Sequence, residues 1–443
     1  MSFDRLGKTI HSFAAQLHKA GVGPGTVVAP FRENPAIFYA LVWAICRLGA
    51  TAACLASIDA AHDDGLKIDF AVTLPDRPAK NVRNLVFGQD WLGAPVGEVP
   101  GEGAGQFIFT SSGTTGRPKY YLARQDVFTS WVAARDGLLE RKQLDTLVML
   151  PVFSAYGLFG ALQCHESGGM VCWPRESAAA TLDSIDSGRR TEIMCTPSGL
   201  QDLLAAFDRG RHKFTLDRII LGGSTVAKEL ARQAEAAFGC PVYNVYGSTE
   251  AGAHAILRVA DSELPKGHVG KVVPGVGLAV EDLNGEAVAA GGEGLVKVTA
   301  PEGCRIDRTL IGESPYDGQG RFVPGDLGYF TPEGELILSG RINEVINSAG
   351  SKVAPDQYES LALKFINATQ IAAFGIPNSL GTEDVGLAIV AEGPLDEGQL
   401  RANLSRAVGT HLQFHVFRVQ ALPVNASGKI DRAALLRQLA REA

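Results

Sequence analysis

The amino-acid sequence predicts an α/β protein with a large N-terminal domain of parallel sheets, a β-rich subdomain and a small α+β C-terminal domain. Short apolar runs alternate with longer helical stretches through the first half of the chain. After about Pro265 the segments become shorter and richer in glycine and valine, which is typical of β-structure. Around Gly340 the pattern changes again, and residues 344–443 have the length of a small separate domain.

Buried strands are predicted wherever short apolar runs occur. These runs occupy residues 27–29, 70–72, 107–109, 147–150, 170–172, 193–195, 219–221 and 242–245. Helical patterns lie between several of them, at residues 10–19, 128–139 and 226–238. Alternation of apolar strands with helices indicates a parallel sheet covered on both faces. In such sheets ligands bind at the carboxyl ends of the strands, where most of the glycine-rich segments of this chain fall.

A long apolar helix is predicted over residues 35–56. Arg47 interrupts it, and the apolar run before Arg47 is shorter than the ~20 residues that span a bilayer. We therefore predict a buried core helix and no insertion into a membrane.

Domain boundaries are predicted from the changes in composition. The N-terminal domain occupies residues 1–340, with the β-rich subdomain at about residues 265–340. Residues 294–299 and 335–338 are strand candidates within that subdomain. The C-terminal domain occupies residues 344–443.

Charge and cysteine usage restrict the class of protein. The 443 residues carry a formal net charge of −7 and no basic block, which argues against nucleic acid or an anionic membrane surface as the main partner. The seven cysteines form no C-x-x-C pair, which indicates free thiols in a reducing compartment. The nine histidines show no metal-ligand spacing, and no charged-then-apolar leader opens the chain. We expect a cytoplasmic protein.

A loop of glycines and hydroxyls follows the predicted strand at residues 107–109. Residues 110–119 read Thr-Ser-Ser-Gly-Thr-Thr-Gly-Arg-Pro-Lys. The glycines let the backbone approach an anion, successive N–H groups form an anion-binding concavity, and the hydroxyls and lysine add donors and positive charge. We predict that this loop binds a polyphosphate through Thr110, Ser111, Ser112, Gly113, Thr114, Thr115, Gly116 and Lys119.

The alternative interpretation of this loop is a polar surface turn, because glycine, serine and threonine also dominate turns. The loop is not of the Walker type, in which the lysine directly follows the second glycine.

Three later clusters have the same character as this loop. Residues 245–250 read Val-Tyr-Gly-Ser-Thr-Glu, residues 325–328 read Gly-Asp-Leu-Gly and precede Gly340-Arg341, and residues 425–432 read Asn-Ala-Ser-Gly-Lys-Ile-Asp-Arg. Together with the loop at 110–119, and in this order, they resemble the adenylate-forming superfamily of acyl-CoA synthetases, peptide-synthetase adenylation domains and beetle luciferases. The resemblance covers roughly residues 13–436.

The resemblance implies a binding site for ATP and Mg²⁺. The loop at residues 110–119 would hold the β- and γ-phosphates of ATP. Asn244 would bond the adenine amino group, and Tyr246 would pack on the adenine ring. Thr249 would contact the α-phosphate, and Glu250 would hold Mg²⁺.

Further residues are implied for the ribose and for the reaction. Asp326 would accept hydrogen bonds from both ribose hydroxyls, and Arg341 would also reach the ribose. Lys429 would neutralise charge while the substrate carboxylate attacks the α-phosphate and pyrophosphate leaves. The small domain would rotate at Asn343 between two half-reactions, so that residues near Gly350 line a thiol channel in the second.

Each of these residues also has a purely structural interpretation. Glu250 could lie in the first turn of a helix and interact with its dipole. Asp326 could be a turn residue between two glycines. Tyr246 could belong to the core, and Lys429 could be a solvated surface lysine.

Residues 150–158 resemble the segment that lines the acyl pocket of the superfamily. Ser154 stands where many acyl and aryl ligases carry His and amino-acid-activating members carry Asp, so an α-amino acid substrate is disfavoured. The side chains expected to face the acid leave room for an aryl or medium-sized acyl group: Phe153, Ser154, Ala155, Tyr156, Gly157 and Ser224. The other departures from the family pattern are Gln125, Pro324, Asn343 and Lys352.

We therefore expect an ATP-dependent carboxylic acid ligase that forms an acyl-adenylate and then a thioester. Residues 347–355 look more like the corresponding segment of acyl- and aryl-CoA ligases than that of peptide synthetases, which favours CoA as the thiol. One alternative is a stand-alone adenylation enzyme that loads the phosphopantetheine of a carrier protein. Another is a nucleotide-binding regulator without catalysis, against which Lys429 and Glu250 argue. A luciferase-like oxygenase has no positive support in the sequence.

Overall fold

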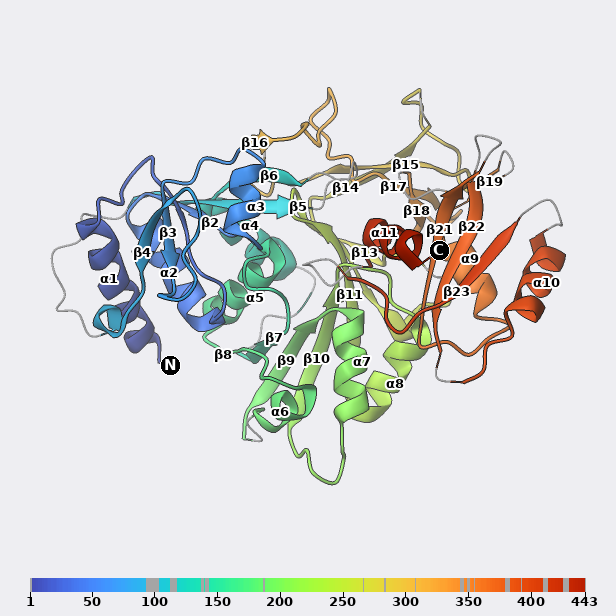
Figure 1. Cartoon of the computed structure of the whole chain (residues 1–443), viewed down its shortest axis with the longest axis horizontal. Coiled ribbons are helices and arrows are strands. Elements are labelled where there is room, and N and C mark those ends of the chain that lie inside the picture. The colour runs from blue at the N-terminus through green and yellow to red at the C-terminus, as the bar shows by residue number, and fades with distance from the viewer. Residues whose placement is uncertain are drawn as a thin grey trace. The chain divides into compact units, whose positions relative to one another are not determined.

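The computed structural model describes most of the chain (Figure 1). The described residues are 2–92, 103–111, 118–136, 139, 143–185, 188–265, 267–282, 284–306, 308–342, 346–348, 351–353, 355–378, 383–391, 393–408, 413–424 and 430–442. They divide into two compact units. Unit 1 holds the described residues up to Leu278 together with Val298–Phe322, and unit 2 holds Ala279–Lys297 and the described residues from Val323 onward. The predicted boundary at residues 340–344 stays a prediction, because residues 343–345 lie outside the described part.

The first sheet of unit 1 has seven strands in the order β16-β6-β5-β2-β1-β3-β4. They are β1 (Val27–Ala29), β2 (Thr51–Ala53), β3 (Phe70–Thr73), β4 (Arg83–Val86), β5 (Gln106–Ser111), β6 (Lys119–Arg124) and β16 (Arg308–Ile311). Strands β1 to β5 pair in parallel, as predicted, whereas β6 and β16 add an antiparallel edge.

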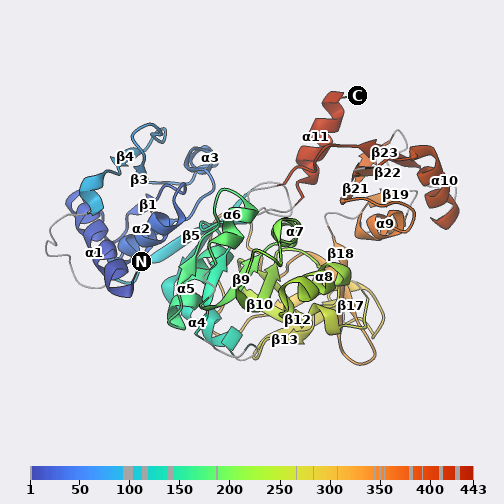
Figure 2. The same cartoon turned by 90° about the horizontal axis from the view of Figure 1, so that it is seen from below.

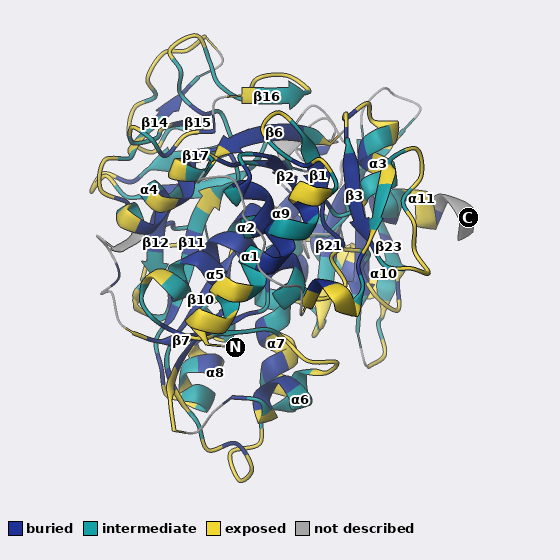
Figure 3. Cartoon of the chain, turned by 90° about the vertical axis from the view of Figure 1, so that its left-hand side faces the viewer, coloured by how far each residue is buried: buried dark blue, intermediate teal, exposed yellow. Residues whose placement is uncertain are grey.

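Helices cover both faces of this first sheet. On one face, α1 (Phe3–Lys19), α2 (Pro35–Arg47), α4 (Gln125–Asp136) and α5 (Ala155–Glu166) contribute to a core that includes Phe13, Phe38, Phe128 and Leu158. On the other face, α3 (Ile58–Asp63) packs against a smaller cluster. Figure 3 shows that buried residues gather on the strands, while exposed residues lie on outer helical faces and connecting loops.

The predicted helix over residues 35–56 is wrong in its length. The helix α2 begins at Pro35, where the Asn34 side chain accepts a hydrogen bond from the Ile37 N–H, and it ends at Arg47. Gly49 then adopts a left-handed backbone with φ of 69°, which ends helices readily because glycine lacks a Cβ. Thr51–Ala53 forms β2 instead, buried between β1 and β5.

The second sheet of unit 1 has the order β13-β12-β11-β10-β9-β7-β8. Its strands are β7 (Asp145–Val148), β8 (Val171–Cys172), β9 (Arg190–Cys195), β10 (Thr215–Gly222), β11 (Val242–Ser248), β12 (Gly252–Arg258) and β13 (Lys271–Val272). Strands β8, β7, β9, β10 and β11 are parallel, and β12 and β13 are antiparallel.

Helices also cover both faces of the second sheet. On one face lie α6 (Ala178–Asp183), α7 (Pro197–Ala206) and α8 (Lys228–Phe238), whose apolar residues join one core cluster with those of the strands (Figure 2). On the other face α5 approaches so closely that a Cβ at Gly160 would lie 2.8 Å from the Met194 sulfur. The predicted arrangement of parallel strands with helices on both faces is therefore confirmed.

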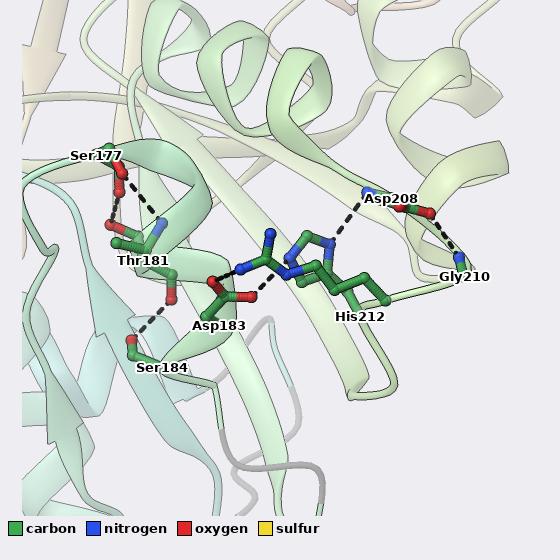
Figure 4. Close-up of polar contacts among 9 residues, drawn as sticks. Ser177, Thr181, Asp183, Ser184, Asp208, Gly210 and His212 are labelled. Atoms are coloured by element: carbon green, nitrogen blue, oxygen red, sulfur yellow. Dashed lines mark hydrogen bonds and ion pairs between the residues drawn. The ribbon is translucent and has the colours of Figure 1, made fainter.

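Polar groups at the amino ends of these parallel strands pair with one another. His212 Nε2 lies 3.2 Å from the Asp183 carboxylate, and the His212 ring accepts the Asp208 N–H through Nδ1 at 3.0 Å (Figure 4). The Ser177 side chain accepts from the Ala180 N–H and so caps α6. These contacts tie the loop before β10 to the helix before β9.

Charged residues form a second set of pairs at the same ends. Arg189 pairs with Asp145, and Arg190 pairs with Asp217. Arg218 and Glu192, which are opposite each other on β10 and β9, form an ion pair in which both side chains are buried.

Unit 2 contains most of a four-stranded sheet of order β14-β15-β17-β18. Its strands are β14 (Gly277–Glu281), β15 (Gly294–Thr299), β17 (Asp326–Phe330) and β18 (Leu336–Arg341). Short strands therefore fill the region at residues 265–340, with β13 and β16 joining the two sheets of unit 1, and the bounds of a separate β-rich subdomain stay a prediction.

The C-terminal part of unit 2 is α+β, as predicted. Strands β21 (Gln370–Pro377), β22 (Glu383–Val390) and β23 (Phe414–Arg418) form a mixed sheet, and β19 (Ile346–Ser348) pairs with β20 (Ser351–Val353). Residues of α9 (Pro355–Ala362) and α10 (Glu397–Val408) pack on one face of the three-stranded sheet. Those of α11 (Arg432–Glu442) pack on the other.

Two general features bear on cellular context. Within the described residues, no helix is both long and apolar enough to cross a membrane. All seven cysteines are described and none is in a disulfide; six are buried and Cys172 is half-buried. Burial raises the pKa of every one of these thiols.

Candidate active site

Several of the site residues predicted in unit 1 follow the carboxyl ends of three parallel strands of the second sheet. Residues 149–158 follow β7, residues 223–224 follow β10, and residues 249–250 follow β11. Because β7, β9, β10 and β11 are parallel, these segments emerge at the same edge of the second sheet. The fold therefore brings Ser154, Ser224 and Glu250 to one edge.

Glu250 lies in the tight turn between β11 and β12. The prediction that Glu250 could begin a helix is wrong, because the chain turns back as an antiparallel hairpin instead. The Ser248 side chain accepts the Ala251 N–H at 3.1 Å across this turn. Gly252 closes it with φ of 73°, and a Cβ there would lie 2.6 Å from Trp131 Nε1, so only glycine fits.

The backbone of Glu250 is held by residues on either side of β16. The Glu250 carbonyl accepts a hydrogen bond from the Ile306 N–H at 2.8 Å and another from the Tyr316 hydroxyl at 2.8 Å. Glu250 is only 8% exposed. Its carboxylate is thus a buried negative group in a fixed turn, which suits a ligand for a hard cation.

The predicted phosphate loop is closed by a β-hairpin. Strands β5 and β6 pair in antiparallel fashion, and Ser111 stands opposite Lys119 at the last pair. Thr110, Ser111 and Lys119 are half-buried at the ends of these strands. The predicted residues Ser112, Gly113, Thr114, Thr115 and Gly116 lie outside the described residues.

Tyr121, on β6, is a residue that the sequence analysis missed. It is 1% exposed, and its hydroxyl completes no hydrogen bond of standard geometry with a described residue. Burial, and to a smaller extent the negative charge of Glu250, raise the pKa of the Tyr121 phenol, whereas the Ser111 hydroxyl lowers it. The negative charge of the predicted Mg²⁺ ligand is thus felt at the Tyr121 phenol. No motif in the sequence signals this effect.

The residues predicted to bind adenine lie on β11. Asn244 is half-buried, and its Oδ1 atom is buried without a hydrogen-bond partner among the described residues. A buried amide oxygen in this state is unfavourable unless a donor reaches it, and an adenine amino group is such a donor. The residue present at this position therefore fits the predicted nucleotide.

Tyr246 is half-buried rather than fully in the core. Its ring meets the His254 ring edge to face, with centroids 5.1 Å apart, and Phe322 lies 5.9 Å from His254 on another side. His254 is fully buried, neither of its ring nitrogens has a hydrogen-bond partner among the described residues, and burial lowers its pKa to about 3. Tyr246 thus rests on a neutral aromatic support.

The segment after β7 has a structural reason for Ser154. The Ser154 hydroxyl donates to the Pro151 carbonyl at 2.7 Å and accepts the Gly157 N–H at 3.0 Å, so it caps the start of α5. A Cβ at Gly157 would lie 2.2 Å from the Pro151 oxygen, which explains glycine there. Ala155 is buried in the same turn.

Two aromatic residues flank this cap. Tyr156 lies against the end of β10, where a Cβ at Gly222 would come within 2.6 Å of its ring. The Arg32 guanidinium lies 5.4 Å from the centre of the half-buried Phe153 ring. Ser224 is exposed.

In unit 2 the two predicted ribose ligands, Asp326 and Arg341, lie close together. They stand opposite each other at the start of β17 and the end of β18, and Arg341 Nε lies 2.9 Å from Asp326 Oδ1. Asp326 is buried and begins a strand, so the interpretation of Asp326 as a turn residue is wrong. Arg341 is half-buried.

Lys429 and its neighbours 425–428 lie outside the described residues, but both flanks of this segment are fixed within unit 2. Val424 and Ile430 form an antiparallel bridge, and the Asp431 N–H donates to the Pro423 carbonyl at 2.8 Å.

Arg432 then anchors the start of α11. Its Nε donates to the Ala373 carbonyl at 2.9 Å, and its NH2 group lies 2.8 Å from the Glu359 carboxylate. The same carboxylate accepts the Ala373 N–H at 3.0 Å. The chain on either side of Lys429 is therefore attached to the three-stranded sheet and to α9.

Among the described residues, no group of three or more His, Cys, Asp or Glu side chains could hold a metal ion by itself. Mg²⁺ is commonly bound by one or two carboxylates together with substrate phosphates. A single buried carboxylate such as Glu250 fits that mode of binding.

Comparisons with known proteins agree with this geometry. The sequence profile of the family described as AMP-binding enzyme matches residues 68–303. A probable CoA ligase of Humulus lupulus is 30% identical, over 97% of this chain and 89% of that protein. An oxalate–CoA ligase of Arabidopsis thaliana is 28% identical, over 97% of this chain and 91% of that protein. The structure of o-succinylbenzoate CoA synthetase of Bacillus subtilis, in complex with ATP and a magnesium ion, superposes with a TM-score of 0.83 at 23% identity, covering 97% of this chain and 93% of that one.

Proposed function

This chain belongs to the AMP-binding enzyme family, and on that premise we propose that it activates a carboxylic acid with ATP and then transfers the acyl group to CoA. The chain is an AMP-forming acid–thiol ligase, and enzymes of this class use ATP, Mg²⁺ and CoA. The observation that supports the proposal best is the carboxyl edge of the second sheet. There Asn244 leaves a buried acceptor that adenine could fill, and Glu250 presents a buried carboxylate.

In the first half-reaction these side chains position the reactants. Asn244 accepts from the adenine amino group, and Tyr246 packs on the ring with His254 behind it. Thr249 contacts the α-phosphate, and the loop closed by Ser111 and Lys119 holds the β- and γ-phosphates. Mg²⁺ held at Glu250 would supply positive charge that offsets the phosphates. Reaction at phosphorus depends mostly on such positioning and electrostatic stabilisation.

Residues of unit 2 complete the proposed reaction. Asp326 accepts from the ribose hydroxyls, and Arg341 keeps that carboxylate oriented through their ion pair. Lys429 neutralises charge as the substrate carboxylate attacks the α-phosphate. In the second half-reaction the CoA thiol attacks the acyl-adenylate and AMP leaves.

The acid is proposed to be an uncharged-tail aryl or acyl carboxylate rather than an α-amino acid. The Ser154 hydroxyl, which stands where amino-acid-activating members carry a carboxylate, already donates to Pro151 and accepts from Gly157. A buried ammonium group without a charged partner is unfavourable by several kcal/mol. Pyrophosphate exchange across a panel of carboxylic acids tests this, and robust exchange with any free α-amino acid would contradict it.

Lys429→Ala tests the reaction itself. We expect acid-dependent pyrophosphate exchange to fall by about 10²–10³, the usual effect of losing a preorganised donor. Thioester formation from supplied acyl-adenylate should change little. The same assay with CoA or with a phosphopantetheinylated carrier protein as acceptor decides between the two thiols. An equal loss in both half-reactions would contradict the separate role of Lys429.

A further inference from the structure

We propose that Tyr316 is a positioning residue for Glu250, because its hydroxyl fixes the backbone of the turn that carries the Glu250 carboxylate. The inference rests on the proposed function, in which Glu250 binds Mg²⁺. It adds a residue from outside the family motifs, since Tyr316 lies 66 positions after Glu250 in the sequence.

The Tyr316 hydroxyl lies between two backbone carbonyls. It donates to the Glu250 carbonyl at 2.8 Å and lies equally close, at 2.8 Å, to the Ile306 carbonyl. The Ile306 N–H donates to the same Glu250 carbonyl at 2.8 Å. Two donors therefore converge on one carbonyl oxygen, which has two lone pairs to accept them. The Glu250 turn is thus fixed by a distant segment of the chain as well as by its own hairpin.

The ring of Tyr316 is held in place without help from its hydroxyl. The Arg305 guanidinium lies 5.0 Å from the centre of the ring, and the Phe322 ring packs against it edge to face with centroids 6.0 Å apart. Tyr316 and Phe322 also form an antiparallel bridge, and Arg305 donates to the Gly320 carbonyl at 2.9 Å. Because these contacts involve only the ring and the backbone, Tyr316→Phe would keep them.

The turn between Tyr316 and Phe322 has many hydrogen bonds of its own. The Asp317 carboxylate accepts from the Gln319 N–H at 3.0 Å and from the Arg321 N–H at 2.9 Å, and it pairs with the Arg321 guanidinium. The Asp317 N–H donates to the Arg321 carbonyl at 2.9 Å. A well-braced turn therefore presents the Tyr316 hydroxyl. This suits a positioning group, because functional side chains need supports that hold them to within about 0.5 Å.

Tight packing encloses the Glu250 turn on another side. Trp131 Nε1 donates to the Cys304 carbonyl at 2.7 Å, and a Cβ at Gly252 would lie 2.6 Å from the same nitrogen. Packing restricts where the turn lies, whereas hydrogen bonds to the Glu250 carbonyl restrict how its peptide plane is oriented. That carbonyl is bonded to the Cα that carries the side chain, so its orientation also limits the direction of the carboxylate.

A structural role and a positioning role for the Tyr316 hydroxyl differ in what its removal changes. A structural hydroxyl would affect the melting temperature alone, whereas a positioning hydroxyl also affects metal binding in the folded protein. Groups that orient metal-ligating carboxylates usually change the metal affinity by about 10–100-fold. Since the Ile306 N–H still holds the Glu250 carbonyl, we expect the lower end of this range.

The test measures the binding of Mn²⁺, as a paramagnetic substitute for Mg²⁺, to the full chain with a non-hydrolysable ATP analogue. The protein is kept in excess over the analogue, and electron paramagnetic resonance gives the free Mn²⁺ concentration without any turnover. We expect Tyr316→Phe to raise the Mn²⁺ dissociation constant about tenfold.

Tyr39→Phe is the matched control. The Tyr39 side chain is buried, and its hydroxyl forms a 3.0 Å hydrogen bond with His165 Nδ1 that joins α2 to the last turn of α5. The control therefore loses a hydrogen-bonded phenol hydroxyl that makes no contact with the Glu250 carbonyl, and it should bind Mn²⁺ like the unsubstituted protein. Unchanged Mn²⁺ affinity in Tyr316→Phe, or an equal loss in Tyr39→Phe, would overturn the inference.

A second arm separates positioning from general damage. In a Glu250→Gln background, Tyr316→Phe should add no further loss of Mn²⁺ affinity, because Tyr316 acts on the metal through Glu250. Additive losses in the double variant, or failure of Tyr316→Phe to fold at the assay temperature, would overturn the inference and leave the proposed function intact. Failure of the unsubstituted protein to bind Mn²⁺ with the ATP analogue would overturn the proposed function and the inference together.

Discussion

At the amino ends of β7, β9 and β10, polar side chains are matched to one another, whereas at the carboxyl ends some of them are not. Asp145, Glu192 and Asp217 each pair with an arginine near the start of a strand. At the other edge Asn244 Oδ1 is buried without a hydrogen-bond partner among the described residues. Charged pairs thus characterise the amino edge of this sheet, whereas the carboxyl edge carries an unpaired amide oxygen.

The difference indicates which edge serves stability and which serves function. Buried polar groups are nearly always hydrogen-bonded in folded proteins, and the proposed adenine amino group would supply the partner that Asn244 Oδ1 lacks. Variants at the amino edge should therefore lower stability and spare the chemistry of the folded fraction. Variants at the carboxyl edge should do the reverse.

The largest effect is expected from breaking the ion pair of Arg218 and Glu192. Arg218→Met leaves a buried carboxylate without its charged partner and should lower the free energy of unfolding by about 3–5 kcal/mol. Urea denaturation measures this. The double variant Glu192→Met/Arg218→Met should recover most of the loss, and pyrophosphate exchange per folded molecule should stay near wild type in it. A double variant as unstable as Arg218→Met would contradict the assignment.

Glu250→Gln tests the carboxyl edge directly. It removes the charge proposed to hold Mg²⁺, and we expect pyrophosphate exchange to fall by about 10²–10³. The melting temperature should stay the same or rise, because a buried carboxylate becomes neutral. A variant that is unstable but as active per folded molecule as wild type would show that Glu250 belongs with the structural pairs.

The stability of the protein should depend on pH through His254. Its pKa is lowered to about 3 in the folded state, so the unfolded chain binds the proton first as the pH falls below about 6.5. This residue should therefore make the protein about 2 kcal/mol less stable at pH 5 than at pH 7. His254→Phe should reduce that loss, which urea denaturation at the two pH values would detect. Equal acid sensitivity in both proteins would show that other groups govern it.

Asn244→Ala should have the smallest effect. Its Oδ1 has no partner among the described residues, so stability should hardly change. Loss of one hydrogen bond to adenine should weaken ATP binding by roughly tenfold, corresponding to about 1.4 kcal/mol. Isothermal titration with a non-hydrolysable ATP analogue measures it. If the variant had a lower melting temperature and an unchanged affinity for the ATP analogue, Asn244 would be a structural residue rather than an adenine ligand.

The sequence alone predicts where the core strands of the second sheet lie, but not which side chains from different strands meet in the folded chain. Apolar runs located every parallel core strand at the second sheet, and motif order placed Glu250 after β11. The hairpin partner β6 was missed because its sequence, Lys-Tyr-Tyr-Leu-Ala-Arg, is polar at both ends and follows a glycine-rich loop. Tyr121 lies on β6 and was therefore missed too. The residues that surround it in the fold are more than a hundred positions apart in the sequence.

Two local misjudgements have local causes. The helix at Pro35 was extended past Arg47 because Ala, Leu and Cys suit either helix or buried strand, and the left-handed Gly49 decides between them. The sequence predicts Ser154 as an uncharged residue facing the acid and gives it no role in the start of α5. A serine three residues before Gly157 is also a helix cap, which the sequence pattern could have indicated.

The seven cysteines have a practical consequence for studying the proposed rotation of the small domain. Thiol reagents attack the thiolate, and these thiols are shielded from solvent and hold their protons more tightly than an exposed cysteine does. A maleimide dye or spin label should therefore react first with a single cysteine introduced on an exposed helix, such as α10 of unit 2. A second one on α8 of unit 1 would complete a reporter pair. Distance changes between the two half-reactions could then be recorded with all the native cysteines left in place.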